Sequence, residues 1–138
     1  MTQPKQRREA SLWLAKAVED IAAARRLMMS PDPLLGVAAY HVQQAAEKLL
    51  KSALTLRAIP FRKTHDLDEL GDQVVAALPA LAPLIEAVRP RTAWAFAFRY
   101  PEGAADAEPV PAASEIEAAL AEIEALRAAI TELSKARP

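Results

Sequence analysis

Apolar side chains recur every three or four positions along most of this chain. That spacing places them on one side of an α-helix. It predicts helices over residues 5–29, 33–56, 67–78, 81–88 and 91–98, and a last helix from Ser114 toward the C-terminus. The residues expected to face the core are Leu14, Val18, Ile21, Arg25 and Met28 in the first helix, Val42, Ala45, Ala46, Leu49, Ala53 and Leu56 in the second, Leu67, Leu70, Val74 and Leu78 in the third, and Ile116, Leu120, Ile123, Leu126, Ile130 and Leu133 in the last.

Proline and capping residues mark where these helices begin and end. Two prolines within residues 30–33 interrupt the helical pattern, because proline lacks an amide donor, and Asp32 between them is expected to cap the second helix. Thr64 or Asp66 is expected to cap the third helix. Ser114 and Glu117 have the spacing of a capping box and predict the start of the last helix.

No segment of the chain reads as a convincing β-strand. Alanine is the commonest residue, 52% of the chain is apolar and only 3 residues are glycine, a composition that favours helix. Amphipathic helices of this length bury their apolar stripes against one another. The sequence therefore predicts an all-α fold, an up-and-down antiparallel bundle of four to five helices in a single domain over residues 1–138. An exposed acidic loop rich in proline and alanine is expected near 102–112.

Composition excludes several classes of function. The chain has no cysteine, which excludes disulfides, thiolate catalysis and cysteine-based metal sites. No apolar run reaches the ~18 residues of a membrane span, and the polar first ten residues show no secretory signal. We therefore expect a cytoplasmic protein that does not enter a membrane. The two histidines are not spaced as metal ligands and no glycine-rich phosphate loop is present, so we expect no metal and no cofactor.

The net charge of -1 hides an uneven distribution of charge along the chain. Residues 1–63 contain 11 Lys and Arg against 5 Asp and Glu, a balance of +6, whereas residues 64–138 contain 6 against 13, a balance of -7. A near-neutral chain is not a globally basic nucleic-acid binder. The split nevertheless leaves room for one locally basic face, or for head-to-tail contact, or for helix faces that differ by chance.

The second predicted helix carries the richest set of polar residues. His41, Gln44, Lys48 and Lys51 are spaced i, i+3, i+7 and i+10, which places them along one side of the helix. Glu47 and Lys51 form an i, i+4 pair in the favourable orientation. Two interpretations stay open, a solvated polar face with one salt bridge or a ligand-binding face.

Two further stretches contain candidate binding residues. The run from Arg62 to Asp66 stands at the start of the third predicted helix. Either His65 and Asp66 only cap that helix, or Arg62, Lys63 and His65 face an anion beside its terminal amides. Arg99 and Tyr100 follow an aromatic-rich segment. The Arg99 guanidinium is expected either to bind phosphate or to form an internal salt bridge, for which Glu47 is a candidate partner.

These stretches, in this order, resemble the HEPN domain family (higher eukaryotes and prokaryotes nucleotide-binding). Its members typically read a tryptophan near the start, a helix of the type QQAAEK, the run KTHDL and then RYP. Here these motifs are Trp13, the run from His41 to Ser52, the run from Phe61 to Leu67, and residues 99–101. Each motif alone is weak, but their combination and order are specific, and the resemblance spans about residues 10–135.

The resemblance implies several properties beyond the fold. HEPN domains are helical bundles that are usually homodimers, and many prokaryotic members are encoded beside a minimal nucleotidyltransferase in pairs that resemble toxin–antitoxin modules. Nucleotide or RNA is the implied ligand. Some members are metal-independent RNases that use an Arg-x(4–6)-His motif across the dimer interface.

This sequence departs from the RNase motif. Arg57 precedes His65 by eight positions and Arg62 precedes it by only three, and no arginine has the required spacing before His41. The catalytic residues are therefore unknown. Three hypotheses follow: a non-catalytic nucleotide- or RNA-binding module that partners a nucleotidyltransferase, a structural bundle with a buried polar network, and a divergent RNase toxin.

Overall fold

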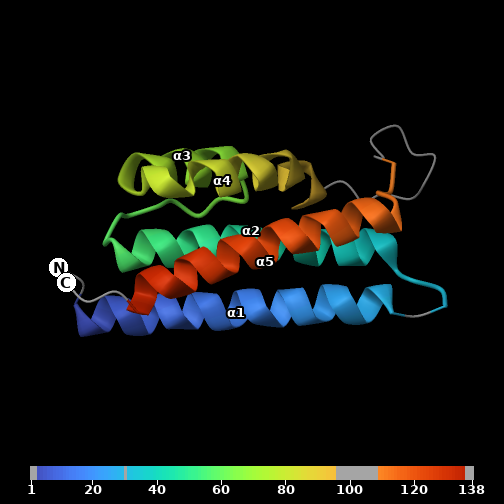
Figure 1. Ribbon diagram of the computed structural model, residues 1–138, viewed down its shortest axis with the longest axis horizontal. Helices are drawn as coiled ribbons and strands as arrows, with labels where there is room; N and C mark the ends of the chain where they lie inside the picture. Colours follow the sequence, from blue (N-terminus) through green and yellow to red (C-terminus); the bar gives the residue numbers. More distant parts are fainter. Residues whose placement is uncertain (1–2, 30, 96–108, 136–138) are drawn as a thin grey trace.

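The computed structural model describes residues 3–29, 31–95 and 109–135. This part of the chain is helical and contains no strand (Figure 1). None of its helices is long and apolar enough to cross a membrane. The elements are α1 (Pro4–Met28), α2 (Leu35–Leu56), α3 (Leu67–Ala77), the 3-10 helix η1 (Pro79–Leu81), α4 (Ala82–Val88), the 3-10 helix η2 (Arg89–Ala95) and α5 (Ala113–Lys135).

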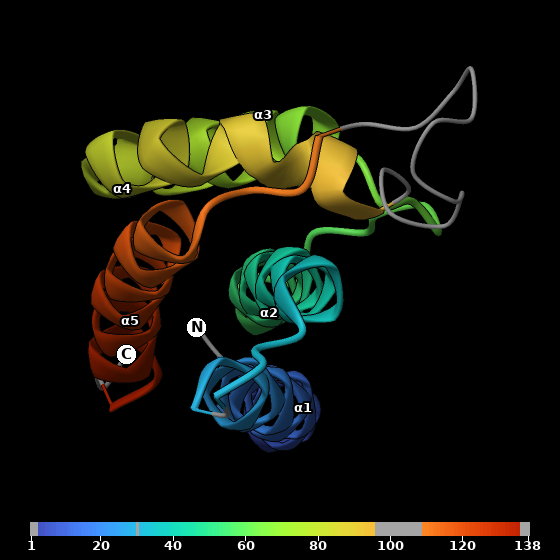
Figure 2. The ribbon, with the colours of Figure 1, turned by 90° about the vertical axis from the view of Figure 1, so that its right-hand side faces the viewer.

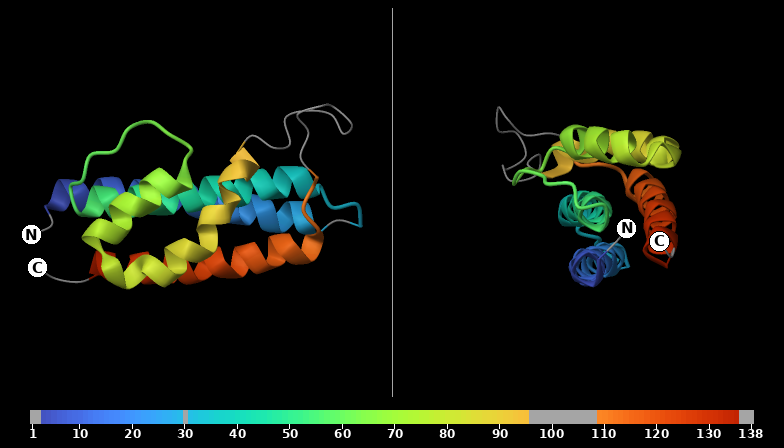
Figure 3. Two further views of the ribbon diagram at one scale, coloured as in Figure 1. Left: turned by 90° about the horizontal axis from the view of Figure 1, so that it is seen from above. Right: turned by 90° about the vertical axis from the view of Figure 1, so that its left-hand side faces the viewer.

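The long helices α1, α2 and α5 run side by side, and the shorter α3 and α4 lie across them as a second layer (Figure 2). α1 and α2 are antiparallel neighbours, and α1 begins at the same end of the bundle at which α5 ends (Figure 3). The prediction of an all-α antiparallel bundle is confirmed. Residues 102–108 of the predicted acidic loop lie outside the described residues.

α2 is the central helix of the bundle. It contacts α1, α3, α5 and η2, and 15 of its 22 residues are buried. The whole stripe that its spacing predicts is buried, and so are residues on its other faces, including Leu50 and Leu54. A helix enclosed on most sides needs partners for its polar side chains as well, and α2 supplies most of the candidate site.

α1 packs on α2 through alanines, which corrects the stripe predicted for it. Its buried residues are Ala10, Ala17, Asp20, Ile21 and Ala24. Leu14, Val18 and Met28 are only partly buried, and Arg25 is exposed. Small side chains allow two helices to approach closely, so the larger residues that dominate a periodicity count flank the contact. The Ser52 hydroxyl on α2 donates to the Ala10 carbonyl at 2.8 Å and fastens the same interface.

N-cap residues were predicted for three helices, and the structure confirms one of them. The Asp66 carboxylate accepts from the Asp68 amide at 2.8 Å, which confirms Asp66 as the cap of α3. α2 begins later than predicted, with Leu34 at its N-cap in place of Asp32. α5 begins at Ala113, so Ser114 lies inside its first turn and is not the cap.

The packing of α3 and α5 follows their predicted stripes. Leu67, Leu70 and Val74 are buried in α3, and all the predicted stripe residues of α5 are buried except the partly buried Leu133. Residues 89–95 form η2, whereas positions 96–98 of the predicted helix over 91–98 lie outside the described residues. Arg91 ties η2 to α5 through Glu122 at 3.2 Å and Glu115 at 3.6 Å.

Candidate polar site on the central helix

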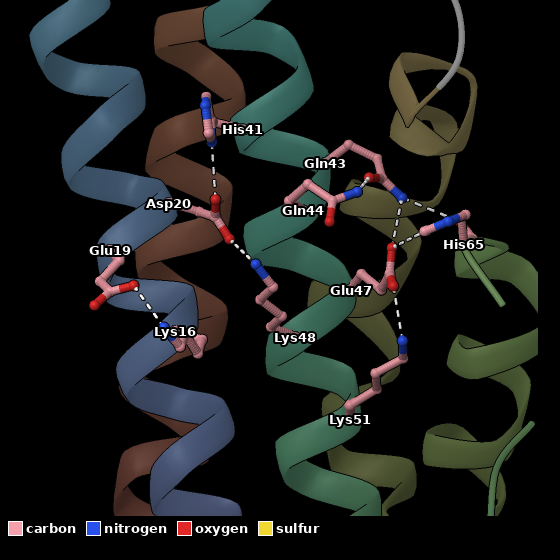
Figure 4. A network of polar contacts seen from close by, with 10 residues as sticks. All are labelled: Lys16, Glu19, Asp20, His41, Gln43, Gln44, Glu47, Lys48, Lys51 and His65. Atoms are coloured by element: carbon pink, nitrogen blue, oxygen red, sulfur yellow. Dashed lines mark hydrogen bonds and ion pairs between the residues drawn. The ribbon is translucent and has the colours of Figure 1, made fainter. Parts of the chain in front are cut away.

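One polar cluster forms where the α2–α3 loop crosses α2. The buried Glu47 carboxylate accepts from the Lys51 ammonium at 2.7 Å through Oε1 and contacts His65 Nδ1 at 2.9 Å through Oε2 (Figure 4). Gln43 donates to the His65 carbonyl at 3.0 Å and to Glu47 at 3.3 Å, and Gln44 donates to Gln43. We call Glu47, Lys51 and His65 the His65 cluster.

Aromatic rings cover the lysine of the His65 cluster. The Lys51 ammonium lies 5.3 Å from the ring centre of Trp13 and 5.9 Å from that of Phe61, and the two rings meet edge to face. The Lys51 side chain is only 8% exposed. A buried ammonium needs a compensating charge, and Glu47 supplies it.

A second cluster lies between α1 and α2. The Asp20 carboxylate of α1 contacts His41 Nδ1 at 2.8 Å through one oxygen and accepts from the Lys48 ammonium at 2.5 Å through the other (Figure 4). We call Asp20, His41 and Lys48 the His41 cluster. His41 also stands edge to face with Tyr40.

The two clusters share one arrangement, in which a buried carboxylate holds a lysine with one oxygen and a histidine with the other. An ionised carboxylate can only accept hydrogen bonds, so each histidine donates through Nδ1 and its neutral form carries a lone pair on Nε2. The His41 and His65 side chains are 29% and 48% exposed. Each cluster can therefore present an oriented imidazole at the surface above a charge-balanced ion pair.

Comparison with known protein families matches the HEPN domain over residues 10–136. The chain belongs to the HEPN family. No curated protein and no solved structure matches it. Family membership agrees with the helical bundle and with the region over which the sequence motifs occur, and the run QQAAEK of this HEPN domain supplies residues to both clusters.

The HEPN structure divides the predicted polar face of residues 41–51 into two. His41 and Lys48 point toward α1, whereas Lys51 lies with Glu47 beneath the loop that carries His65 (Figure 4). The predicted Glu47–Lys51 pair is confirmed. Neither lysine ammonium stands alone, because each is paired with a carboxylate.

The predicted anion-facing loop is occupied by internal contacts. Arg62 donates to Glu69 at 2.6 Å, and the hydrogen bond and the charge of Glu69 raise the pKa of Arg62 above its ordinary value. Lys63 is exposed, and Asp66 is the cap of α3. Arg99 and Tyr100 lie outside the described residues. No group of three His, Asp or Glu that could hold a metal occurs in residues 3–29, 31–95 and 109–135.

Sequence reasoning missed two members of this site, Asp20 and Gln43. Asp20 lies in register with Ala17 and Ala24 on the buried alanine face of α1. A carboxylate on a buried helix face requires a partner. An interpretation that placed the alanines of α1 in the core would therefore have identified Asp20 as a residue with a buried partner. The Gln43 side chain donates to the carbonyl of His65, 22 residues later in the sequence, and no local sequence pattern predicts that contact.

Proposed function

We propose that this HEPN protein is a binding module without catalytic activity and that its ligand is a nucleotide or an RNA. The observation that supports the absence of catalysis is the charge balance of the two clusters. RNA cleavage needs a proton-transfer group beside a cation that stabilises the phosphate. Here Lys48 and Lys51 are neutralised by Asp20 and Glu47, which also hold the histidines.

The ligand contacts are proposed for the outer edge of the clusters. His65 is the most exposed of their ionisable groups, and Lys63 is exposed two residues before it. His41 is a second candidate contact, on the side of α2 that faces α1. Gln44 is buried, and Asp66 caps α3. The His41 imidazole is held through Nδ1 by Asp20, so its Nε2 can donate to a phosphate oxygen or bond to a base edge.

Calorimetry tests the binding proposal. Wild-type protein is titrated with ATP, GTP and a short RNA, alongside His65→Ala and Lys63→Ala. We expect micromolar binding of at least one ligand and about a tenfold loss in His65→Ala, because a hydrogen bond to a charged group contributes roughly 1.5 kcal/mol or more. A matched control is Lys135→Ala, which removes an exposed cation at the end of α5 that is paired with Glu132. Binding of none of these ligands would refute the proposal.

Incubation of the purified protein with total RNA tests the claim that it is non-catalytic. We expect no cleavage by the wild type. Cleavage that is present in the wild type and lost in His41→Ala/His65→Ala would instead establish the RNase alternative. Cleavage that persists in the double variant after a second purification step would refute the non-catalytic proposal and reject both histidines as catalysts.

The partners implied by HEPN membership are part of the proposal. We propose a homodimer that acts with a minimal nucleotidyltransferase in a toxin–antitoxin-like pair. A nucleotidyltransferase encoded next to this protein and co-purifying with it would support the pair. Light scattering at micromolar concentration tests the dimer, and a monomeric mass would contradict it.

A structural role for the polar network is the second candidate. One observation favours it: apart from the histidines, the charged groups of the two clusters form two ion pairs within the bundle, Asp20 with Lys48 and Glu47 with Lys51. On this alternative Glu47→Gln lowers thermal stability and His65→Ala changes no ligand affinity. Loss of ligand affinity in His65→Ala with an unchanged melting temperature would reject it in favour of the binding module.

A further inference from the structure

A surface groove lies between α1 and α5, near the end of the bundle that carries the α1–α2 connection. α5 crosses the bundle obliquely, and its first turns lie farther from α1 than its C-terminal end does (Figures 1 and 2). α1 packs far more extensively on α2 than on α5. The groove has a volume of about 290 Å³. It is lined by Arg25, Met28 and Met29 on one side and by Glu117 and Leu120 of α5 on the other.

Most of the groove surface is apolar. Met29 is 80% exposed, the highest value among the large apolar residues that the structure describes. Met28 is partly buried and packs on the core, and Leu120 of the opposite wall is buried. Methionine is unbranched and polarizable, so it adapts to apolar side chains of different shape and is common on surfaces that bind helices. The groove can therefore accept apolar side chains from another molecule.

Glu117 gives this groove a negative charge that is not balanced within the chain. Among the described residues it is the one carboxylate with neither an ion pair nor a hydrogen bond. Arg25, the cation of the groove, lies 3.8 Å from a different carboxylate, that of Glu124. α5 as a whole contains five glutamates against one arginine and one lysine. A cation on a partner would therefore be attracted to the α5 wall of the groove.

We propose that the groove docks a basic amphipathic helix of a protein partner. Apolar side chains of that helix pack against the two methionines and Leu120, and a lysine or arginine among them pairs with Glu117. Helices that bind in grooves use apolar anchors spaced i, i+3 or i+4, and i+7. A groove between two helices can seat such a row, and the unpaired carboxylate selects a helix that carries a cation.

This surface is separate from the two histidine clusters. Arg25 follows Asp20 by five positions in α1, which puts the two side chains about 140° apart around the helix. Asp20 faces α2 and His41, whereas Arg25 faces α5. The inference therefore goes beyond the proposed ligand site and does not depend on it.

Two helical peptides test the docking surface. Each has about 12 residues, or about 18 Å of helix, on an alanine background held helical by a side-chain staple. Leucines occupy positions i, i+3 and i+7, and one central residue is lysine in the first peptide and glutamate in the second. Calorimetry measures their binding to the full-length wild type, to Glu117→Lys and to Met29→Ser.

The matched control is Glu132→Lys, which changes the charge of α5 by the same amount. Glu132 is 75% exposed and lies about 22 Å along the helix from Glu117. Thermal unfolding of each variant checks that it is folded.

We expect the wild type to bind the lysine peptide about tenfold more tightly than the glutamate peptide, because only the lysine can pair with Glu117. Glu117→Lys should reverse that preference. Met29→Ser should weaken binding of both peptides about fivefold, since it removes apolar contact without adding charge. Glu132→Lys should keep the wild-type preference within about twofold.

Three results would overturn the inference. Binding of neither peptide to the wild type at millimolar concentration would show that the groove does not seat a helix. Equal binding of both peptides, or the same change of preference in Glu132→Lys as in Glu117→Lys, would show a response to overall charge instead of to Glu117. A doubled mass in light scattering that Met29→Ser abolishes would assign the groove to a second copy of this chain.

Discussion

At the residue scale, the buried carboxylates of Glu47 and Asp20 each neutralise one lysine, and the two lysines differ in how much of the side chain is exposed to water. The Lys51 side chain is 8% exposed, and aromatic rings cover it. The Lys48 side chain is 24% exposed. Removing a carboxylate from a buried pair leaves an uncompensated ammonium, so the cost depends on whether that ammonium can be hydrated.

We therefore predict that Glu47→Gln is more destabilising than Asp20→Asn. Glu47→Gln should cost about 3–5 kcal/mol, the usual penalty for breaking a buried pair. Asp20→Asn should cost about 1–2 kcal/mol, since Lys48 can turn to water. Urea unfolding measures both. Equal costs would contradict the role assigned to burial, and Glu47→Leu/Lys51→Met should recover much of the loss because no charge remains buried.

A second residue-scale prediction concerns Ala58 at the end of α2. Its φ is 57°, in the left-handed region that favours glycine. The amides of Ala58 and Ile59 donate to the carbonyls of Thr55 and Leu54, which is the Schellman pattern. Ala58→Gly should stabilise the protein by about 0.5–1 kcal/mol, a rise in melting temperature of a few degrees. A lower melting temperature would show that the backbone is not strained there.

At the scale of elements, α3 and α4 touch closely at a glycine. A Cβ on Gly71 would lie 2.8 Å from Cγ2 of the buried Ile85 and 3.4 Å from the Arg89 guanidinium. Arg89, which directly follows α4 as its C-cap and is the first residue of η2, forms ion pairs with Asp68 and Asp72 of α3. Burial lowers the pKa of Arg89, but hydrogen bonds to Asp72, Glu86 and Asp68 outweigh it and raise that pKa, so the clamp stays charged.

Gly71→Ala tests this contact. Alanine is the better helix former by about 1 kcal/mol, yet overpacking a core costs about 1–3 kcal/mol, and we expect a net loss of about 1 kcal/mol. Ile85→Leu moves the branch away from Cβ and removes the Cγ2 methyl. Calorimetry should therefore find Gly71→Ala/Ile85→Leu more stable than the two single changes together predict. Strict additivity would mean that the contact relaxes by another route.

At the scale of the whole molecule, every layer depends on α2. It contacts α1 on one side and α3, η2 and α5 on the others. Its interior residues have almost no exposed surface. A densely buried element unfolds only when the whole protein unfolds, whereas an element at the outside of the fold can unfold locally.

Hydrogen exchange should report this hierarchy. We expect amides of residues 42–54 to exchange at the rate of global unfolding and amides of the first turns of α1 to exchange much faster. Mass spectrometry of exchanged peptides measures the difference. Faster exchange in residues 42–54 than in α5 would show that α2 is not the last element to open.

How much of this could be predicted differs between the fold and the site. The helical bundle could be predicted from apolar stripes such as that of α2, because the large apolar residues of that stripe are the ones buried in the core. The stripe predicted for α1 was right at Ile21 and wrong at Arg25, and it left out the alanines that make most of the contact, because a count of large residues overlooks them. The Glu47–Lys51 pair is local and was predicted. Asp20 and His65 reach their partners across helices and loops, so only the packed structure brings them together.

The alanine contact between α1 and α2 also bears on the order of folding. Alanine has no side-chain rotamers to lose, so this contact forms at little entropic cost beyond that of the backbone. The two helices are joined by a short connection, residues 29–34, whereas α5 joins the bundle after a much longer stretch of chain. Local contacts form faster than distant ones. We therefore expect the α1–α2 hairpin to be the folding nucleus and α5 to dock last.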